Sequence, residues 1–134
     1  MKALLVDTNL LLRFLTDDVP SQVDKVERRF QEAEKGNFDL VILPFVVAEV
    51  IFQLEHWYKY PKPEACNKLL LLFAPEWMKV EEKPAVFEGL RVYKERSIDF
   101  VDLLLWSMAK TRGQGVLSFD KDFDKLEPKI RVEP

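Results

Sequence analysis

The chain has very little cysteine and histidine. Among 134 residues there is one cysteine, Cys66, and one histidine, His56. A single cysteine excludes a disulfide within the chain, which agrees with a reducing compartment. A single histidine means that any hydrolytic centre in this sequence has to be one that needs no set of imidazoles.

Long apolar runs and an excess of basic charge are also absent. No run approaches the roughly 20 apolar residues that span a bilayer, and the N-terminus lacks the long apolar region of a signal peptide. We therefore expect a cytoplasmic protein. The net charge of −3 argues against a broad basic surface for nucleic acid. It does not exclude nucleic acid, because acids gathered in one pocket can hold a metal that presents positive charge to a phosphate.

Short apolar runs alternate with longer segments of helical spacing. The runs predict strands at 4–6, 40–43, 78–80 and 116–119, with an edge-like strand at 130–132. The segments between them predict helices at 10–15, 21–35, 44–58, 64–73, from 84 onward, 98–112 and a short one ending at 126. This alternation predicts an α/β fold with a parallel sheet and helices on both faces. The length fits one domain over residues 1–134. The helix at 44–58 is apolar nearly all round, so we expect it to be buried, and the helix at 98–112 is the second strongly apolar one.

Four acids stand at the ends of these apolar elements. Asp7 and Asp120 each follow a strand directly, so both are expected at the carboxyl edge of the sheet, where ligands of open α/β sheets bind. Glu49 lies about one and a half turns into the helix after the second strand. Asp102 lies near the start of the helix that leads into the fourth strand. The spacing therefore allows all four carboxylates to meet at one corner.

Carboxylates in an apolar setting require a partner. An unpaired buried carboxylate costs several kcal/mol, and no lysine or arginine lies three or four residues from Asp102. Hard oxygen ligands suit Mg²⁺ or Mn²⁺. Three or four carboxylates can hold one or two such ions, roughly 3.5–4 Å apart if two, as in sites that cleave phosphodiesters with an activated water.

Each acid also has a purely structural interpretation. Asp7, Asp99 and Asp120 are placed to cap helices, and Asp102 could belong to a capping box. Glu49 could lie at a solvated helix edge. Five neighbouring residues could support the site, or could only hydrogen-bond the turn backbone or face solvent: Thr8, Asn9, Asp99, Ser118 and Asp122. Asp122 is also an alternative to Asp120 as the fourth acid.

Four motifs resemble those of a known family. The motifs follow one another in the order and spacing of PIN-domain ribonucleases. They are Val6-Asp7-Thr8-Asn9, a Glu in an apolar helix at position 49, Asp99-Phe100-Val101-Asp102-Leu103-Leu104, and Ser118-Phe119-Asp120-Lys121-Asp122-Phe123. The nearest group in this resemblance is the toxin ribonucleases of VapBC toxin–antitoxin pairs. The resemblance covers the whole chain; each motif alone is short, and the four in order are fairly specific.

The resemblance implies a specific set of properties. The fold would be a five-stranded parallel sheet of order 3-2-1-4-5 flanked by helices. Asp7, Glu49, Asp102 and Asp120 would match the four acidic positions that bind Mg²⁺ or Mn²⁺ for endonucleolytic cleavage of RNA. A homodimer and an antitoxin whose tail covers the acidic site would be the partners. The motifs do not separate a toxin from a stand-alone nuclease.

Two other functions fit parts of the sequence. A haloacid-dehalogenase-like phosphatase also starts with a strand and an aspartate, but it needs a second aspartate where this chain has Asn9. A non-catalytic PIN-fold interaction module would keep the fold and use the acids as caps. A melting temperature that rises with metal would separate a metal site from such a module.

Overall fold

The computed structural model describes residues 2–134, which form two compact units, the first ending at Glu81 and the second spanning Glu82–Pro134. Each unit has its own elements and its own buried residues, and each is described here by itself. In residues 2–134, no helix is long and apolar enough to cross a membrane.

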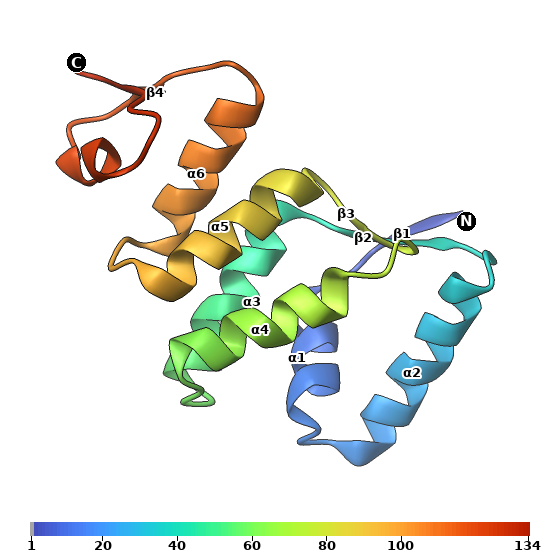
Figure 1. The fold of residues 1–134 in the computed structure, drawn as a ribbon. Coiled ribbons are helices and arrows are strands. Elements are labelled where there is room, and N and C mark those ends of the chain that lie inside the picture. Colours follow the sequence, from blue (N-terminus) through green and yellow to red (C-terminus); the bar gives the residue numbers. More distant parts are fainter. Residues whose placement is uncertain (1) are drawn as a thin grey trace. The chain divides into compact units, whose positions relative to one another are not determined.

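The first unit is a three-stranded parallel sheet with four helices. Its elements are β1 (Ala3–Leu5), α1 (Thr8–Thr16), α2 (Pro20–Glu34), β2 (Asp39–Ile42), α3 (Pro44–His56), α4 (Lys62–Phe73) and β3 (Met78–Val80). The strands lie side by side in the order β1-β2-β3, with Leu4 opposite Leu40 and Leu40 opposite Met78 (Figure 1). This arrangement confirms the 3-2-1 part of the predicted strand order.

Buried aliphatic side chains hold the first unit together. Its most deeply buried residues come from the helices and from strands β2 and β3, and include Leu11, Leu12, Ile42, Val47, Val50, Leu54, Leu69 and Met78. Prolines begin α2 and α3, as expected for a residue whose missing amide is not needed at a helix start. Gly36, just past α2, has φ +87°, the left-handed conformation that favours glycine after a helix.

The second unit is a helix pair followed by a two-stranded parallel ladder. Its elements are α5 (Lys83–Glu95), α6 (Phe100–Thr111), β4 (Val116–Leu117), the 3₁₀ helix η1 (Lys121–Lys125) and β5 (Arg131–Val132). β4 and β5 pair with Leu117 opposite Val132, which confirms the 4-5 part of the predicted order. A compact core of Ile98, Leu103, Trp106, Ala109, Val116, Phe123 and Leu126 supports these elements.

Polar contacts also fix α5 against α6. The hydroxyl of Ser107, which is fully buried, donates to Glu88 Oε1 (2.7 Å), and Lys110 forms an ion pair with the same carboxylate. Arg112, at the end of α6, donates to both carboxylate oxygens of Glu82, at the start of α5, at 3.1 and 2.8 Å. The C-terminal part of α6 is therefore tied to the start and the middle of α5 by charged hydrogen bonds.

The expectation that the helix at 44–58 is buried all round is wrong for one of its faces. Phe45 and Phe52 of α3 are 69% and 52% exposed, and Val101 and Leu105 of α6 are also exposed. In β1, Leu5 is likewise 69% exposed. High apolar content predicted burial all round, whereas each of these elements buries only the face that packs against its own unit.

Candidate functional site

Asp7 follows β1 and begins α1. Its Oδ1 accepts hydrogen bonds from the backbone amides of Asn9 (2.6 Å) and Leu10 (3.3 Å), so the carboxylate caps the helix. The capping interpretation of Asp7 is therefore confirmed. Capping uses one carboxylate oxygen and leaves Asp7 exposed, so it does not prevent a further ligand from binding.

Asp7 lies at a cavity within the first unit. The cavity has a volume of about 660 Å³, and apolar side chains from β1, α2 and β2 form much of its lining. Besides Asp7, its polar lining residues include Asn9, Arg13, Lys25 and Arg29. The guanidinium of Arg13 is already engaged by Gln22, Asp18 and Tyr58.

Glu49 belongs to the same unit as Asp7. β1 and β2 are parallel neighbours, so α1 and α3, which follow them, begin at the same edge of the sheet. The Glu49 carboxylate is exposed and accepts a hydrogen bond from Gln53 Nε2 (2.9 Å). This exposed position of Glu49 agrees with both interpretations, a solvated helix edge and a metal ligand, and does not separate them.

Asp102 has the most unusual electrostatic surroundings of the four acids. Partial burial raises its pKa above the ordinary value, and negative charges raise it further; they come from Asp99, Asp120 and Asp122. Every charged group that shifts this pKa is thus an acid. The second unit therefore brings together the acidic residues that the sequence placed at the start of α6 and after β4.

The turn after β4 holds Asp120 by local hydrogen bonds. Ser118 Oγ accepts from the Asp120 amide (2.9 Å), and Asp120 Oδ1 accepts from the Asp122 amide (2.9 Å). Asp120 therefore caps η1, and Ser118 satisfies turn backbone, as their structural interpretations predicted. Asp122 pairs with Lys125 at 2.8 Å, whereas no such ion pair engages Asp120 among the residues described. This difference favours Asp120 over Asp122 as a ligand.

Asp99 and Thr8 occupy helix starts. Asp99 is the N-cap residue of α6, but within the described chain its side chain makes no capping bond. Asp102 lies in the first turn of that helix, three residues on. Thr8 is the first residue of α1, directly after Asp7.

Arg131 is a supporting residue that the sequence did not single out. Its guanidinium donates to the Ser118 carbonyl (3.1 Å) and to both carboxylate oxygens of Asp124, and its side chain is only 11% exposed. It thereby ties β5 to the turn that carries Asp120. A lone arginine in an edge strand gives no pattern from which this contact could be predicted.

The donor set fits a hard divalent cation by its chemistry. Carboxylates are the preferred ligands of Mg²⁺ and Mn²⁺, and a cation would relieve the repulsion that raises the pKa of Asp102. Over residues 2–134, however, neither unit by itself gathers three His, Cys, Asp or Glu side chains closely enough to hold a metal ion. The convergence of all four acids stays a prediction, since Asp7 and Glu49 belong to one unit and Asp102 and Asp120 to the other.

Comparison with known proteins decides the family. A family model described as "PIN domain" matches residues 4–128. The chain belongs to the PIN-domain family. It is also 32% identical over 123 residues to a protein named "VapC ribonuclease" from Aquifex aeolicus (strain VF5), an alignment that covers 91% of this chain and 90% of that relative. The predicted family resemblance, VapC-like PIN proteins included, is thereby confirmed.

Proposed function

We propose that this PIN-domain protein is a Mg²⁺- or Mn²⁺-dependent endoribonuclease and the toxin of a toxin–antitoxin pair. The observation that carries the proposal is the group of acids around the partly buried Asp102, namely Asp99, Asp120 and Asp122, in a chain of the PIN-domain family. The similarity to a protein named VapC ribonuclease supports RNA as the substrate. Phosphodiester hydrolysis by a cation held on carboxylates requires no histidine.

The four acids would hold the cation, with Asp7 and Glu49 from the first unit and Asp102 and Asp120 from the second. A bound divalent ion activates a water for attack on the phosphodiester and stabilises the leaving oxygen. Asp7 and Asp120 are held in place by their capping hydrogen bonds. Asp99 and Asp122 would add negative charge, while Thr8, Asn9 and Ser118 would orient water or phosphate.

A strand order of 3-2-1-4-5 would unite the two units in a single domain over residues 1–134. β1 pairs with β2, and β4 pairs with β5, so one further pairing, β1 with β4, completes this order. Leu5 of β1 and Leu117 of β4 are 69% and 71% exposed, which supports the idea that these strands have another neighbour. In that order the carboxyl ends of β1 and β4, and therefore Asp7 and Asp120, would be adjacent.

The proposed partners follow from the proposed toxin function. They are the RNA substrate, a second copy of the chain in a homodimer, and an antitoxin protein whose tail covers the acids. The proposed location is the cytoplasm. A stand-alone nuclease would share the same acids and would differ in having no antitoxin.

A non-catalytic interaction module is the second candidate, and one observation favours it. Asp7 and Asp120 already serve as helix caps, so capping alone would explain both of them. It does not explain Asp102, whose side chain lies among acids with no capping role assigned to it.

Cleavage of a mixed set of labelled RNAs tests the nuclease proposal. The chain and its Asp102→Asn variant, purified identically, are incubated with Mg²⁺, with Mn²⁺ or with EDTA. Metal-dependent cutting that is lost in the variant supports the proposal. Cutting shared by both proteins indicates a contaminant. The interaction module is favoured if the chain cleaves no RNA and its melting temperature does not rise with metal.

A further inference from the structure

Arg131 contacts the chain on both sides of Asp120. Its Nη1 donates to the carbonyl oxygen of Ser118 (3.1 Å), two residues before Asp120. Its Nε and Nη2 donate to the carboxylate of Asp124, four residues after Asp120, at 3.1 and 2.9 Å. One guanidinium therefore holds both ends of the segment 118–124, in which the proposed ligand lies. We call these contacts of Arg131 with Ser118 and Asp124 the arginine clamp.

Ser118 connects the arginine clamp to Asp120. The Ser118 amide donates to the Val132 carbonyl of β5 (3.2 Å), so the amide and the carbonyl of Ser118 are both held by β5. The Ser118 hydroxyl accepts from the Asp120 amide (2.9 Å), and Asp120 Oδ1 accepts from the Asp122 amide (2.9 Å). Consecutive hydrogen bonds thus lead from the Arg131 guanidinium to the residue proposed to bind the cation.

Apolar packing does not fix the chain at Asp120. Phe119, the residue before it, is 77% exposed, and Asp120 and Lys121 are exposed as well. The first buried side chain after Asp120 is Phe123, which belongs to the core of the unit and anchors η1. The position of Asp120 therefore depends on polar contacts, and β5 supplies such contacts from outside the segment.

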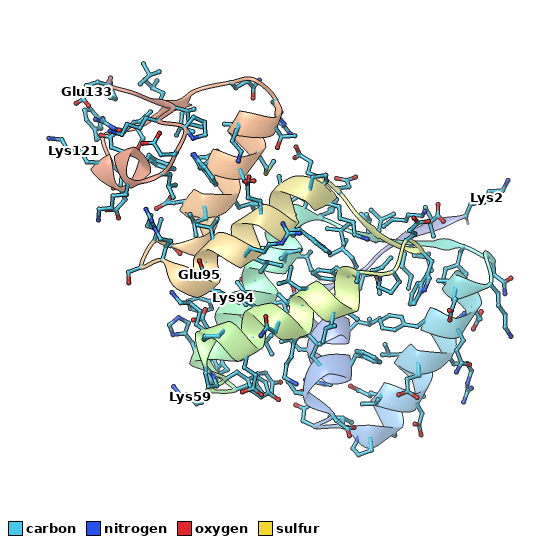
Figure 2. All side chains as sticks on the ribbon, viewed as in Figure 1. Lys2, Lys59, Lys94, Glu95, Lys121 and Glu133 are labelled. Carbon is cyan, nitrogen blue, oxygen red and sulfur yellow. The ribbon has the colours of Figure 1, made fainter. Side chains whose placement is uncertain are left out.

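Arg131 is placed to act by geometry and not by a free positive charge. Its side chain is only 11% exposed, and its guanidinium forms ion pairs with two carboxylates, those of Asp124 and Glu133. Figure 2 shows Glu133, which follows β5, on the same side of the unit as Lys121, with which η1 begins. With two negative partners, the guanidinium leaves no excess positive charge that would repel a cation.

We infer that Arg131 is a positioning residue for metal binding, which holds Asp120, through Ser118, where its carboxylate binds the cation. The inference rests on the proposed function, because it needs the cation that the acids are proposed to hold. Residues that orient metal ligands from outside the coordination sphere change metal affinity roughly 10- to 100-fold. Arginine suits this role because its planar group donates in several fixed directions at once, which lysine cannot do.

Positioning and simple electrostatics predict opposite effects of Arg131→Gln on cation affinity. Removal of a positive charge near acids strengthens cation binding if charge alone matters. Loss of the arginine clamp weakens cation binding, because Asp120 then occupies several positions and the cation has to select one of them. The sign of the change in affinity therefore separates the two explanations.

Arg112→Gln is the matched control for Arg131→Gln. Arg112 lies in the same unit and donates to both carboxylate oxygens of Glu82, at 3.1 and 2.8 Å. Its substitution therefore removes the same charge and a similar ion pair, which connects α6 to α5 instead of β5 to η1.

The Mn²⁺ affinity of the full chain is measured by calorimetry for the parent, Arg131→Gln, Arg131→Lys and Arg112→Gln, below the lowest of their melting temperatures. We expect Arg131→Gln to raise Kd by roughly 10-fold or more. Arg131→Lys should raise it less, because an ammonium group keeps the charge and part of the contacts. Arg112→Gln should leave Kd unchanged.

Hydrogen exchange of the Asp120 and Asp122 amides, followed by NMR, gives a second readout that needs no metal. Both amides form hydrogen bonds within the segment that the arginine clamp holds. We expect both to exchange faster in Arg131→Gln and in Asp124→Asn than in the parent. The Leu103 amide, which donates to a backbone carbonyl at the start of α6 (3.0 Å), should keep its rate. That contrast separates local loosening from unfolding of the whole unit.

Three results would overturn the positioning role. If the parent binds Mn²⁺ and Arg131→Gln binds it as tightly or more tightly, Arg131 positions no ligand, whereas the proposed metal site stands. If the Asp120 and Asp122 amides exchange at unchanged rates in Arg131→Gln, the arginine clamp does not hold the segment, whether or not the chain binds metal. A parent that binds no Mn²⁺ contradicts the proposed metal site itself and, with it, any role of Arg131 in metal binding.

Discussion

Asp102 and Asp124 belong to the same unit and have opposite electrostatic surroundings. Burial and neighbouring acids raise the pKa of Asp102, whereas the hydrogen bonds and charge of Arg131 lower the pKa of Asp124. A raised pKa means that the folded state disfavours the charged form, and a lowered pKa means that it favours that form. The two aspartates therefore form a matched pair for mutation.

Asp102→Asn should stabilise the metal-free protein, and Asp124→Asn should destabilise it. The first variant removes a charge that its neighbours repel, so we expect the melting temperature in EDTA to rise by roughly 1–3 °C. The second removes the partner of Arg131, so the melting temperature should fall. Thermal unfolding at neutral pH measures both. A lower melting temperature for Asp102→Asn would make that carboxylate a structural residue.

Glu88 provides a pH-dependent contribution to stability. Partial burial alone would raise its pKa, but hydrogen bonds from Lys110 and Ser107 and the charge of Lys110 outweigh burial and lower it. Because the pKa is lower in the folded state, the contribution is present above the ordinary value of 4.5 and is lost as the pH falls through the folded pKa. Glu88→Gln should have a lower melting temperature than the parent chain at neutral pH. On acidification its melting temperature should fall less than that of the parent chain.

Melting curves of the parent and Glu88→Gln between about pH 7 and pH 3 would measure this difference. Ser107→Ala, which removes one donor to the same carboxylate, should shift the curve in the same direction by a smaller amount. If the melting temperatures of the parent chain and Glu88→Gln change in parallel with pH, Glu88 and its partners do not contribute to the pH dependence of stability.

At the scale of elements, α1 combines a structural and a proposed chemical role in one residue. Asp7→Asn keeps a capping oxygen, so the free energy of unfolding should change little, whereas Asp7→Ala removes the cap and should cost about 1 kcal/mol. Both variants should lose cleavage if Asp7 also binds the metal. Urea unfolding and RNA cleavage together separate the roles, and an Asp7→Asn variant that cleaves normally would leave Asp7 as a cap only.

Helices and strands could be predicted well from the sequence, because the spacing of apolar residues and the turn residues that determine them extend over only a few positions. The β3 strand agrees with its predicted range, and α2, α3 and β2 agree closely. The exposure of Phe45 and Phe52 could not be predicted, because an apolar helix does not indicate which of its faces has a neighbour.

The acidic site was predictable only in part. The positions of Asp7, Asp102 and Asp120 at the ends of apolar elements identified them, and the second unit does place acids around Asp102. The contact of Arg131 with Asp124 and the Ser118 carbonyl depends on how η1 and β5 fold together. No local sequence pattern encodes such a contact.

At the scale of the whole molecule, the proposed pairing of β1 with β4 can be tested by burial. If the pairing covers Leu5, Leu5→Lys should lower the free energy of unfolding by roughly 1–3 kcal/mol. Leu71→Lys is the control, because Leu71 is 77% exposed on α4 and the pairing does not involve it. Equally small effects of both substitutions in urea unfolding would count against the predicted strand order.

The central claim is that acids from both units bind one ion, and a double-mutant cycle on Mn²⁺ binding tests it most directly. Mn²⁺ affinity is measured by calorimetry for the parent, Asp7→Asn, Asp102→Asn and the double variant. We predict that each single variant loses most of the affinity and that the double variant loses little more, because both carboxylates serve the same ion. Losses that simply add, or a single variant that binds Mn²⁺ like the parent, would contradict a shared site.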